Sequence, residues 1–129
     1  MSVVSNTNIP DDILHINESE TATYLPSLPQ PFAVLFERGQ LSVELFSPVE
    51  IDTQTPHDRD EIYIVSSGHG VFRRGETYVN FSAGDFLFVP AYVDHRFESF
   101  SKDFRTWVIF FGPIGGNSIH NRGEDMASQ

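Results

Sequence analysis

Short apolar runs, separated at close intervals by turn residues, occupy the chain from Phe32 to Phe111 and leave no room for long helices. Within the run 41–46, apolar and polar side chains alternate, as they do in a strand with one face on a core. The intervening sequences are rich in Gly, Asp and Ser, which favour tight turns. Since no window shows sustained helical periodicity, the pattern predicts an all-β fold.

We expect about nine strands in this region, at 32–36, 41–46, 49–57, 61–66, 70–73, 77–81, 86–89, 94–100 and 105–111. Many short strands joined by tight turns favour a sandwich or a closed jelly-roll barrel, because these architectures leave few sheet edges exposed. Trp107, Ile109 and Phe111 would share one face of the last strand. We interpret them as core, with the wall of a ligand pocket as the alternative.

The 129 residues of the chain suit a single domain. We expect an N-terminal arm over residues 1–30, a barrel over 31–112 and a flexible C-terminal tail over 113–129. The arm mixes polar residues with isolated apolar ones and ends in a cluster of prolines. Two interpretations stay open, an extended arm that lies across the barrel or a partner subunit, and a loosely attached terminus.

The charge and composition of the chain limit the partners and the metal ligands that it can have. With 18 acidic and 8 basic residues the net charge is -10, so the chain repels nucleic acid and anionic membranes, and neither is an expected partner. Because there is no cysteine, any bound metal must be held by imidazole and carboxylate groups. No apolar run approaches a membrane span of roughly 20 residues, and no signal pattern begins the chain. We therefore expect a cytoplasmic protein.

His57 and Glu61 flank three polar residues, 58–60, and are the first candidates for chemistry. If 58–60 form a hairpin loop, the two flanking side chains face each other across antiparallel strands. If the strand instead continues, positions 57 and 61 still share a face, because side chains alternate along a strand. Either geometry brings the imidazole near the carboxylate. Arg59 would lie at the tip of the turn, in solvent.

The segment around these residues resembles the first cupin motif, in which a His-x-His pair is followed by Glu and, after six further residues, by Gly. His57, Glu61 and Gly68 match the second histidine, the glutamate and the glycine. Thr55 then stands at the position of the first histidine.

A second segment, which ends at Ser99, resembles the second cupin motif. Gly84, Pro90 and His95 match it, whereas Tyr92 replaces the motif glycine and Ser99 the asparagine. Together, in this order, the two segments make the chain similar to the single-domain, type 2 cupins. The resemblance implies a double-stranded β-helix, which is a jelly-roll barrel, and a homodimer.

The resemblance also implies that His57, Glu61 and His95 hold one divalent ion, which would be Fe, Mn, Zn, Ni or Co. Thr55 is a poor ligand, so two interpretations stay open, a site that has lost its ion and a three-ligand site with water in the vacant place. We expect an occupied site. As a less favoured alternative, Gln54 substitutes for the missing ligand.

Two functions agree with such a site. One is a metal-dependent enzyme, an oxygenase, isomerase or lyase, that acts on a small molecule with help from Tyr63 or Tyr92. The other is a module that binds a small ligand without chemistry, its metal site being degenerate. A purely structural dimer is a third and less favoured hypothesis.

Overall fold

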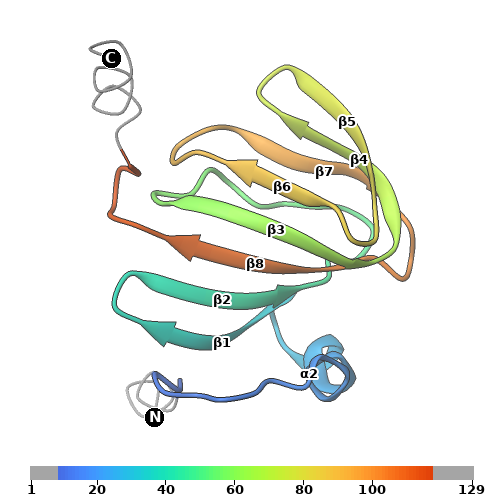
Figure 1. Cartoon of the computed structure of the whole chain (residues 1–129). Coiled ribbons are helices and arrows are strands. Elements are labelled where there is room, and N and C mark those ends of the chain that lie inside the picture. The colour runs from blue at the N-terminus through green and yellow to red at the C-terminus, as the bar shows by residue number, and fades with distance from the viewer. Residues whose placement is uncertain (1–8, 118–129) are drawn as a thin grey trace, which may run out of the picture.

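The computed structural model of the protein describes residues 9–117, and this part consists mainly of β-strands in antiparallel pairs (Figure 1). The strands are β1 (Phe32–Arg38), β2 (Leu41–Phe46), β3 (Asp60–Ser67), β4 (His69–Arg74), β5 (Thr77–Ser82), β6 (Phe86–Val89), β7 (His95–Phe100) and β8 (Arg105–Phe111). The predicted all-β fold is confirmed. The beginning of the predicted arm, 1–8, and most of the predicted tail, 118–129, lie outside the described residues.

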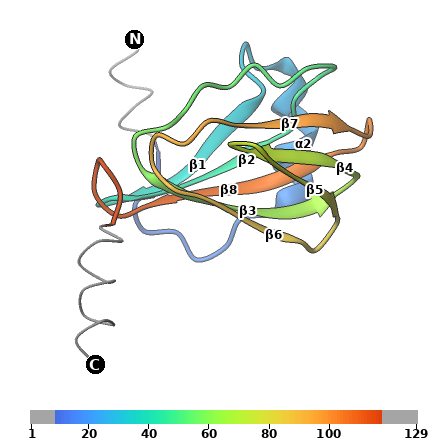
Figure 2. The same ribbon diagram turned by 90° about the horizontal axis from the view of Figure 1, so that it is seen from above.

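The strands form two facing sheets, as Figures 1 and 2 show from two directions. The larger sheet has the order β1-β2-β8-β3-β6 and the smaller sheet the order β5-β4-β7. The chain passes from the larger to the smaller sheet at the turn between β3 and β4. Gly68, the motif glycine, lies in this turn with a φ of 90°, and an added side chain there would collide with the backbone of Phe104.

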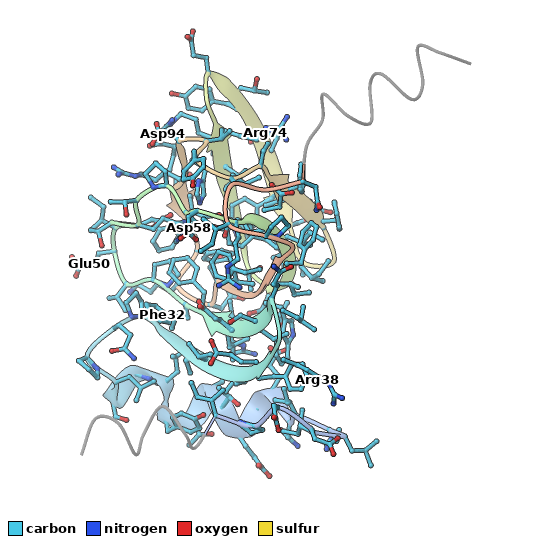
Figure 3. The ribbon with its side chains drawn as sticks, turned by 90° about the vertical axis from the view of Figure 1, so that its left-hand side faces the viewer. Phe32, Arg38, Glu50, Asp58, Arg74 and Asp94 are labelled. Carbon is cyan, nitrogen blue, oxygen red and sulfur yellow. The ribbon has the colours of Figure 1, made fainter. Side chains whose placement is uncertain are left out.

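The main core lies between the two sheets, where an end-on view shows side chains filling the space (Figure 3). It consists of Phe46, Tyr63, Val65, Phe72, Phe81, Val89, Phe97, Phe104, Val108 and Phe110. Because side chains alternate along β8, Val108 and Phe110 point into this core whereas Trp107 points to the opposite face of the sheet. Trp107 packs against a second, smaller core cluster on that face, so the core interpretation holds for it in this form, whereas Trp107 does not line the pocket.

The outer face of the larger sheet is covered by the N-terminal segment, which is not simply extended as we had predicted. It contains the short helix α2 (Glu18–Tyr24) and a 3-10 turn, η1 (Leu25–Ser27). The side chain of Asn17 caps α2 by accepting a hydrogen bond from the backbone N–H of Glu20 at 3.1 Å. No helix among residues 9–117 is long and apolar enough to cross a membrane.

Two sets of contacts hold α2 to the sheet. Glu18 accepts hydrogen bonds from Nε1 of Trp107 at 2.9 Å and from Nε of Arg105 at 2.7 Å, and it also contacts the Ser66 hydroxyl. Leu25 packs beside Leu45 in a second, smaller apolar cluster. The described part of the N-terminal segment therefore lies across its own sheet, as one of the two open interpretations expected.

Residues 47–59, called here the β2–β3 loop, contain no strand, so the prediction of a strand over 49–57 was wrong. Pro48 and Pro56 have no N–H to give to a sheet. Glu50 has a positive φ of 66°, and the carboxylate of Asp52 accepts a hydrogen bond from the backbone N–H of Gln54 at 3.0 Å. Such local bonds compete with strand pairing.

Candidate metal centre

The structure brings His57, Glu61 and His95 together from three separate elements. Glu61 lies on β3, His95 begins β7, and His57 belongs to the β2–β3 loop. Oε1 of Glu61 is 2.9 Å from Nε2 of His95 and 3.8 Å from Nε2 of His57. One ligand atom from each residue lies within 4.8 Å of the others, which is close enough for all three to contact a single ion.

The position of His57 is fixed by a backbone contact with the second motif. The carbonyl of His57 accepts a hydrogen bond from the N–H of Tyr92 at 2.7 Å. Tyr92 has a φ of 68°, in the left-handed region that favours glycine, and it stands at the position of the motif glycine. Its side chain is 60% exposed, so the hypothesis that Tyr92 assists at the site is not supported by its placement.

The imidazole of His95 is oriented by its other nitrogen. Nδ1 lies 2.8 Å from the carbonyl oxygen of Val93, and because a carbonyl only accepts, Nδ1 carries the proton of that hydrogen bond. In a neutral imidazole the lone pair is then on Nε2, which faces Glu61. This arrangement is usual for a histidine that binds a metal.

Glu61 is buried, and among residues 9–117 neither of its carboxylate oxygens accepts a hydrogen bond of good geometry. A buried carboxylate that accepts no hydrogen bond is costly unless a positive charge compensates it. The charge of Glu61 raises the pKa of both neighbouring imidazoles, but their net shifts differ. Burial lowers the pKa of His57, whereas for His95 the contact with Glu61 outweighs burial and raises the pKa. The site therefore attracts positive charge.

The side chain that completes this group is Gln54, whereas the spacing of the motif had pointed to Thr55. Thr55 is exposed. Oε1 of Gln54 lies 3.1 Å from Nε2 of His57 and 3.2 Å from Nε2 of His95, and it accepts a hydrogen bond from the Tyr63 hydroxyl at 3.0 Å. Tyr63 is thus beside the site, as predicted.

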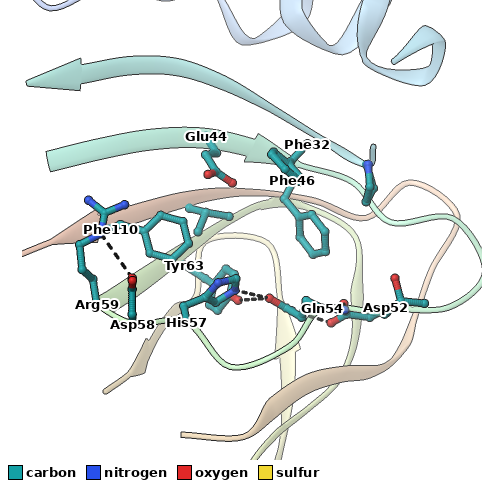
Figure 4. Close-up of a pocket in the computed structure, with 13 residues that line it drawn as sticks. Phe32, Glu44, Phe46, Asp52, Gln54, His57, Asp58, Arg59, Tyr63 and Phe110 are labelled. Carbon is teal, nitrogen blue, oxygen red and sulfur yellow. Dashed lines mark hydrogen bonds and ion pairs between the residues drawn. The ribbon is translucent and has the colours of Figure 1, made fainter. Parts of the chain in front are cut away.

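A pocket of about 360 Å³ opens above this group, between the β2–β3 loop and the larger sheet (Figure 4). Its polar base includes Gln54, His57 and Tyr63. Its apolar walls are formed by Phe32, Phe46, Val108 and Phe110. A cavity of this size with a few convergent polar groups is typical of a small-molecule site.

Glu44, which the sequence analysis did not single out, points into the pocket from β2 (Figure 4). Burial, together with the nearby charge of Glu61, raises its pKa from 4.5 to about 7. In the sequence, Glu44 shares its strand face with Ser42 and Phe46, opposite the apolar face of Leu41, Val43 and Leu45. The available signal was therefore weak, a single Phe46 on an otherwise polar face.

Arg59 does not extend freely into solvent, so that expectation was wrong. Its guanidinium lies 5.3 Å from the centre of the Phe110 ring, and Nη1 donates a hydrogen bond to the carbonyl of Gln40 at 2.9 Å. Arg59 also lines the pocket. It therefore adds a positive charge beside the carboxyl of Glu44.

The cupin domain family matches residues 42–110, which is more than half of the chain and includes every candidate ligand. This protein belongs to the cupin family. A protein from Thermus thermophilus has a similar fold, with a TM-score of 0.58, 20% identity and coverage of 78% of this cupin and 100% of that protein. A cupin-2 domain containing protein from Shewanella frigidimarina has a TM-score of 0.56 and 21% identity. The match covers 73% of this cupin and 91% of that protein.

A relative is also found by sequence. An uncharacterised protein of Streptomyces coelicolor is 39% identical to this cupin over 62 residues, which are 48% of this chain and 59% of that protein. The matched part thus spans about three fifths of the relative's length. The solved structures support the cupin fold.

The residues present fit a divalent metal ion. Two imidazole nitrogens and a carboxylate oxygen are ligands that first-row divalent metals accept. The buried carboxylate of Glu61 accepts no hydrogen bond among residues 9–117, and such an ion would place a positive charge beside it.

Proposed function

We propose that this cupin binds one divalent metal ion through His57, Glu61 and His95 and catalyses a reaction of a small molecule in the pocket above them. The observation that carries this proposal is the buried carboxylate of Glu61, whose oxygens accept no hydrogen bond in the described part of the chain. The two imidazoles contact it from different elements, so the fold concentrates lone pairs around one point.

When bound, a divalent ion supplies Lewis-acid polarisation of an oxygen atom. Glu44 supplies proton transfer, because a carboxyl group with a pKa of about 7 can both give and take a proton near neutral pH. Phe46, Val108 and Phe110 give the same pocket apolar walls. This combination suits an isomerase or lyase, in which a proton moves next to a polarised oxygen.

The pocket also suggests the class of substrate. Its volume of about 360 Å³ suits a small molecule, and its walls are mainly apolar. Arg59 at its border can bind an anionic oxygen through the planar guanidinium group. We propose a small organic acid as the substrate.

Thermal unfolding of untagged protein tests the proposal. The protein is first stripped of metal with a chelator, and this metal-free form is called the chelated protein. Adding Zn²⁺ or Mn²⁺ to it should raise the melting temperature of the wild type, and the rise should be absent in His95→Ala. His69→Ala is the matched control, because His69 is exposed on β4 outside the site and should respond like the wild type. A wild type whose melting temperature does not respond to either metal would refute metal binding.

The same assay separates ligand binding that depends on the ion from ligand binding that does not. A panel of small 2-hydroxy and 2-oxo acids should stabilise the metal-loaded protein more than the chelated protein. If these acids stabilise both forms equally, the pocket binds ligands independently of the ion, and the catalytic part of the proposal fails.

Several expectations remain proposals. They are the division into an arm (1–30), a barrel (31–112) and a tail (113–129), the cytoplasmic location, the homodimer and the absence of nucleic acid and membrane partners. In support of a dimer, Tyr78 and Phe86 are 61% and 60% exposed on the edge strands β5 and β6. Light scattering in solution measures the oligomeric state directly.

A further inference from the structure

The carboxamide of Gln54 occupies the place around Glu61 and the two histidines where a further ligand would lie. Its Oε1 is 3.1 Å from Nε2 of His57 and 3.2 Å from Nε2 of His95. Neighbouring ligand atoms bound at about 2.1 Å from one ion are separated by about 3.0 to 3.4 Å. The spacing of Gln54 from both imidazoles therefore agrees with a shared ion.

The orientation of this carboxamide is determined by Asp52. Nε2 of Gln54 donates a hydrogen bond to Oδ2 of Asp52 at 2.6 Å, and because a carboxylate only accepts, the amide nitrogen must face Asp52 (Figure 4). The amide oxygen must then face the histidines. The Tyr63 hydroxyl, which donates to the same oxygen at 3.0 Å, agrees with this orientation.

Asp52 is itself held rigidly. Its side chain is buried, and it also accepts hydrogen bonds from the backbone N–H of Phe97 at 2.9 Å and of Gln54 at 3.0 Å. Phe97 lies on β7, two residues after His95. Asp52 therefore links the β2–β3 loop to the strand that carries His95, and it fixes the position of Gln54 relative to that histidine.

We propose that Gln54 is the fourth protein ligand of the divalent ion and that Asp52 is the positioning residue that orients it. This inference rests on the proposed function, since it requires that an ion binds. Thr55, the position that the motif assigns to a histidine, is exposed and takes no part. The resulting set has two imidazole nitrogens, one carboxylate oxygen and one carboxamide oxygen.

This ligand set has a consequence for metal preference. A carboxamide oxygen is neutral, as an imidazole is, so the charge of the site is unchanged. It is also a harder donor, and oxygen ligands suit Mn²⁺ better than imidazoles do. Gln54→His should therefore shift preference from Mn²⁺ toward Ni²⁺, measured by competition between the two ions.

The direct test is titration of chelated, untagged protein with Co²⁺, followed by calorimetry and by the visible absorption of the bound ion, which reports its ligands. We expect Gln54→Ala to weaken Co²⁺ binding by about 10- to 100-fold and to change the spectrum. Thr55→Ala is the control, because Thr55 is next to Gln54 in the chain and is exposed. It should leave the Co²⁺ affinity and the spectrum unchanged. Thr55→His should not tighten binding.

The outcomes separate this inference from the proposed function. If the wild type binds no Co²⁺, the proposed function fails. If the wild type binds Co²⁺ and Gln54→Ala binds it with the same affinity and spectrum, only the role of Gln54 fails. Tighter binding by Thr55→His together with an unaffected Gln54→Ala would show that position 55 faces the ion, and it would overturn the proposal.

A second pair of variants tests Asp52. Asp52→Asn should weaken Co²⁺ binding by about 10-fold, because the amide of Gln54 is no longer forced into one orientation. Adding Gln54→Glu should restore binding, since both carboxylate oxygens can bind a metal and no orientation is needed. If Asp52→Asn lowers only the melting temperature and leaves Co²⁺ affinity and spectrum unchanged, Asp52 does not position the ligand.

Discussion

Oε1 of Gln54 lies 3.2 Å from Nε2 of His95, although 41 positions separate the two residues in the chain. Gln54 belongs to the β2–β3 loop and His95 to β7 of the smaller sheet, while Glu61 comes from the larger sheet. The group therefore assembles only when both sheets and the loop have packed. An ion bound there would stabilise the folded protein, because the unfolded chain has no such site.

Replacing Glu61 should raise the free energy of unfolding in the absence of metal and lower it in the presence of metal. In metal-free protein at about pH 8, Glu61→Gln should raise the free energy of unfolding by about 1 to 3 kcal/mol, because the substitution removes a buried charge that accepts no hydrogen bond among residues 9–117. In excess Zn²⁺ the same variant should be less stable than the wild type. Urea denaturation measures both, with the exposed Glu76→Gln as control. Destabilisation in both conditions would contradict the account.

Glu44 should make stability depend on pH. Its pKa is raised from 4.5 to about 7, so the folded protein keeps a proton that the unfolded chain releases. This contribution lowers the free energy of unfolding as pH rises from 4.5 to about 7, and it stays constant above that.

Glu44→Gln removes this contribution. In chelated protein the variant should exceed the wild type in stability by up to about 3 kcal/mol at about pH 8, with little difference at pH 4.5. Urea denaturation across the pH range gives the measurement. An equal effect of the substitution at both pH values would mean that Glu44 titrates normally.

Tyr92→Gly should stabilise the protein. Tyr92 has a φ of 68° and an exposed side chain, so glycine relieves backbone strain at the loss of few contacts. We expect a gain of about 1 kcal/mol. Tyr92→Ala keeps the β-carbon, and thus the strain, and should show no gain. Thermal unfolding compares the two variants, and equal stabilities would argue against strain at this position.

Glu18→Ala should detach α2 from the sheet without affecting the metal centre. Glu18 accepts hydrogen bonds from Trp107 and Arg105, and losing them should lower the free energy of unfolding by about 2 kcal/mol. Hydrogen exchange should be faster in α2, while Co²⁺ affinity stays unchanged. Glu20→Ala, an exposed residue of the same helix, is the control. A loss of Co²⁺ affinity would show that α2 also supports the site.

Much of the fold was predictable because period-two alternation and turn residues are local signals. β6 was predicted at 86–89 and begins and ends there. Alternation also showed that Trp107 shares a face with Ile109. It did not reveal which face lies against the main core, because Leu25 and Leu28 of the N-terminal segment make the other face apolar as well. α2 itself was missed, since a helix of seven residues depends on tertiary contacts such as those of Glu18.

The proximity of His57 and Glu61 was predictable from their spacing, whereas that of His95 followed only from the resemblance to the cupin motifs. For position 54, the sequence offered Gln54 only as the less favoured substitute for the missing ligand. A prediction of side-chain direction from motif spacing assumes a regular strand, but residues 47–59 form an irregular loop. Which side chain turns inward there depends on Asp52, whose partner Phe97 lies 45 residues away.

The central claim is that one divalent ion binds to His57, Glu61 and His95. An anomalous-scattering map from crystals of untagged, Zn²⁺-loaded protein tests this claim most directly. The account predicts one strong peak at bonding distance, about 2.0 to 2.2 Å, from Nε2 of His57, Nε2 of His95 and an oxygen of Glu61. No peak at this position, or a peak only at the protein surface, would contradict it.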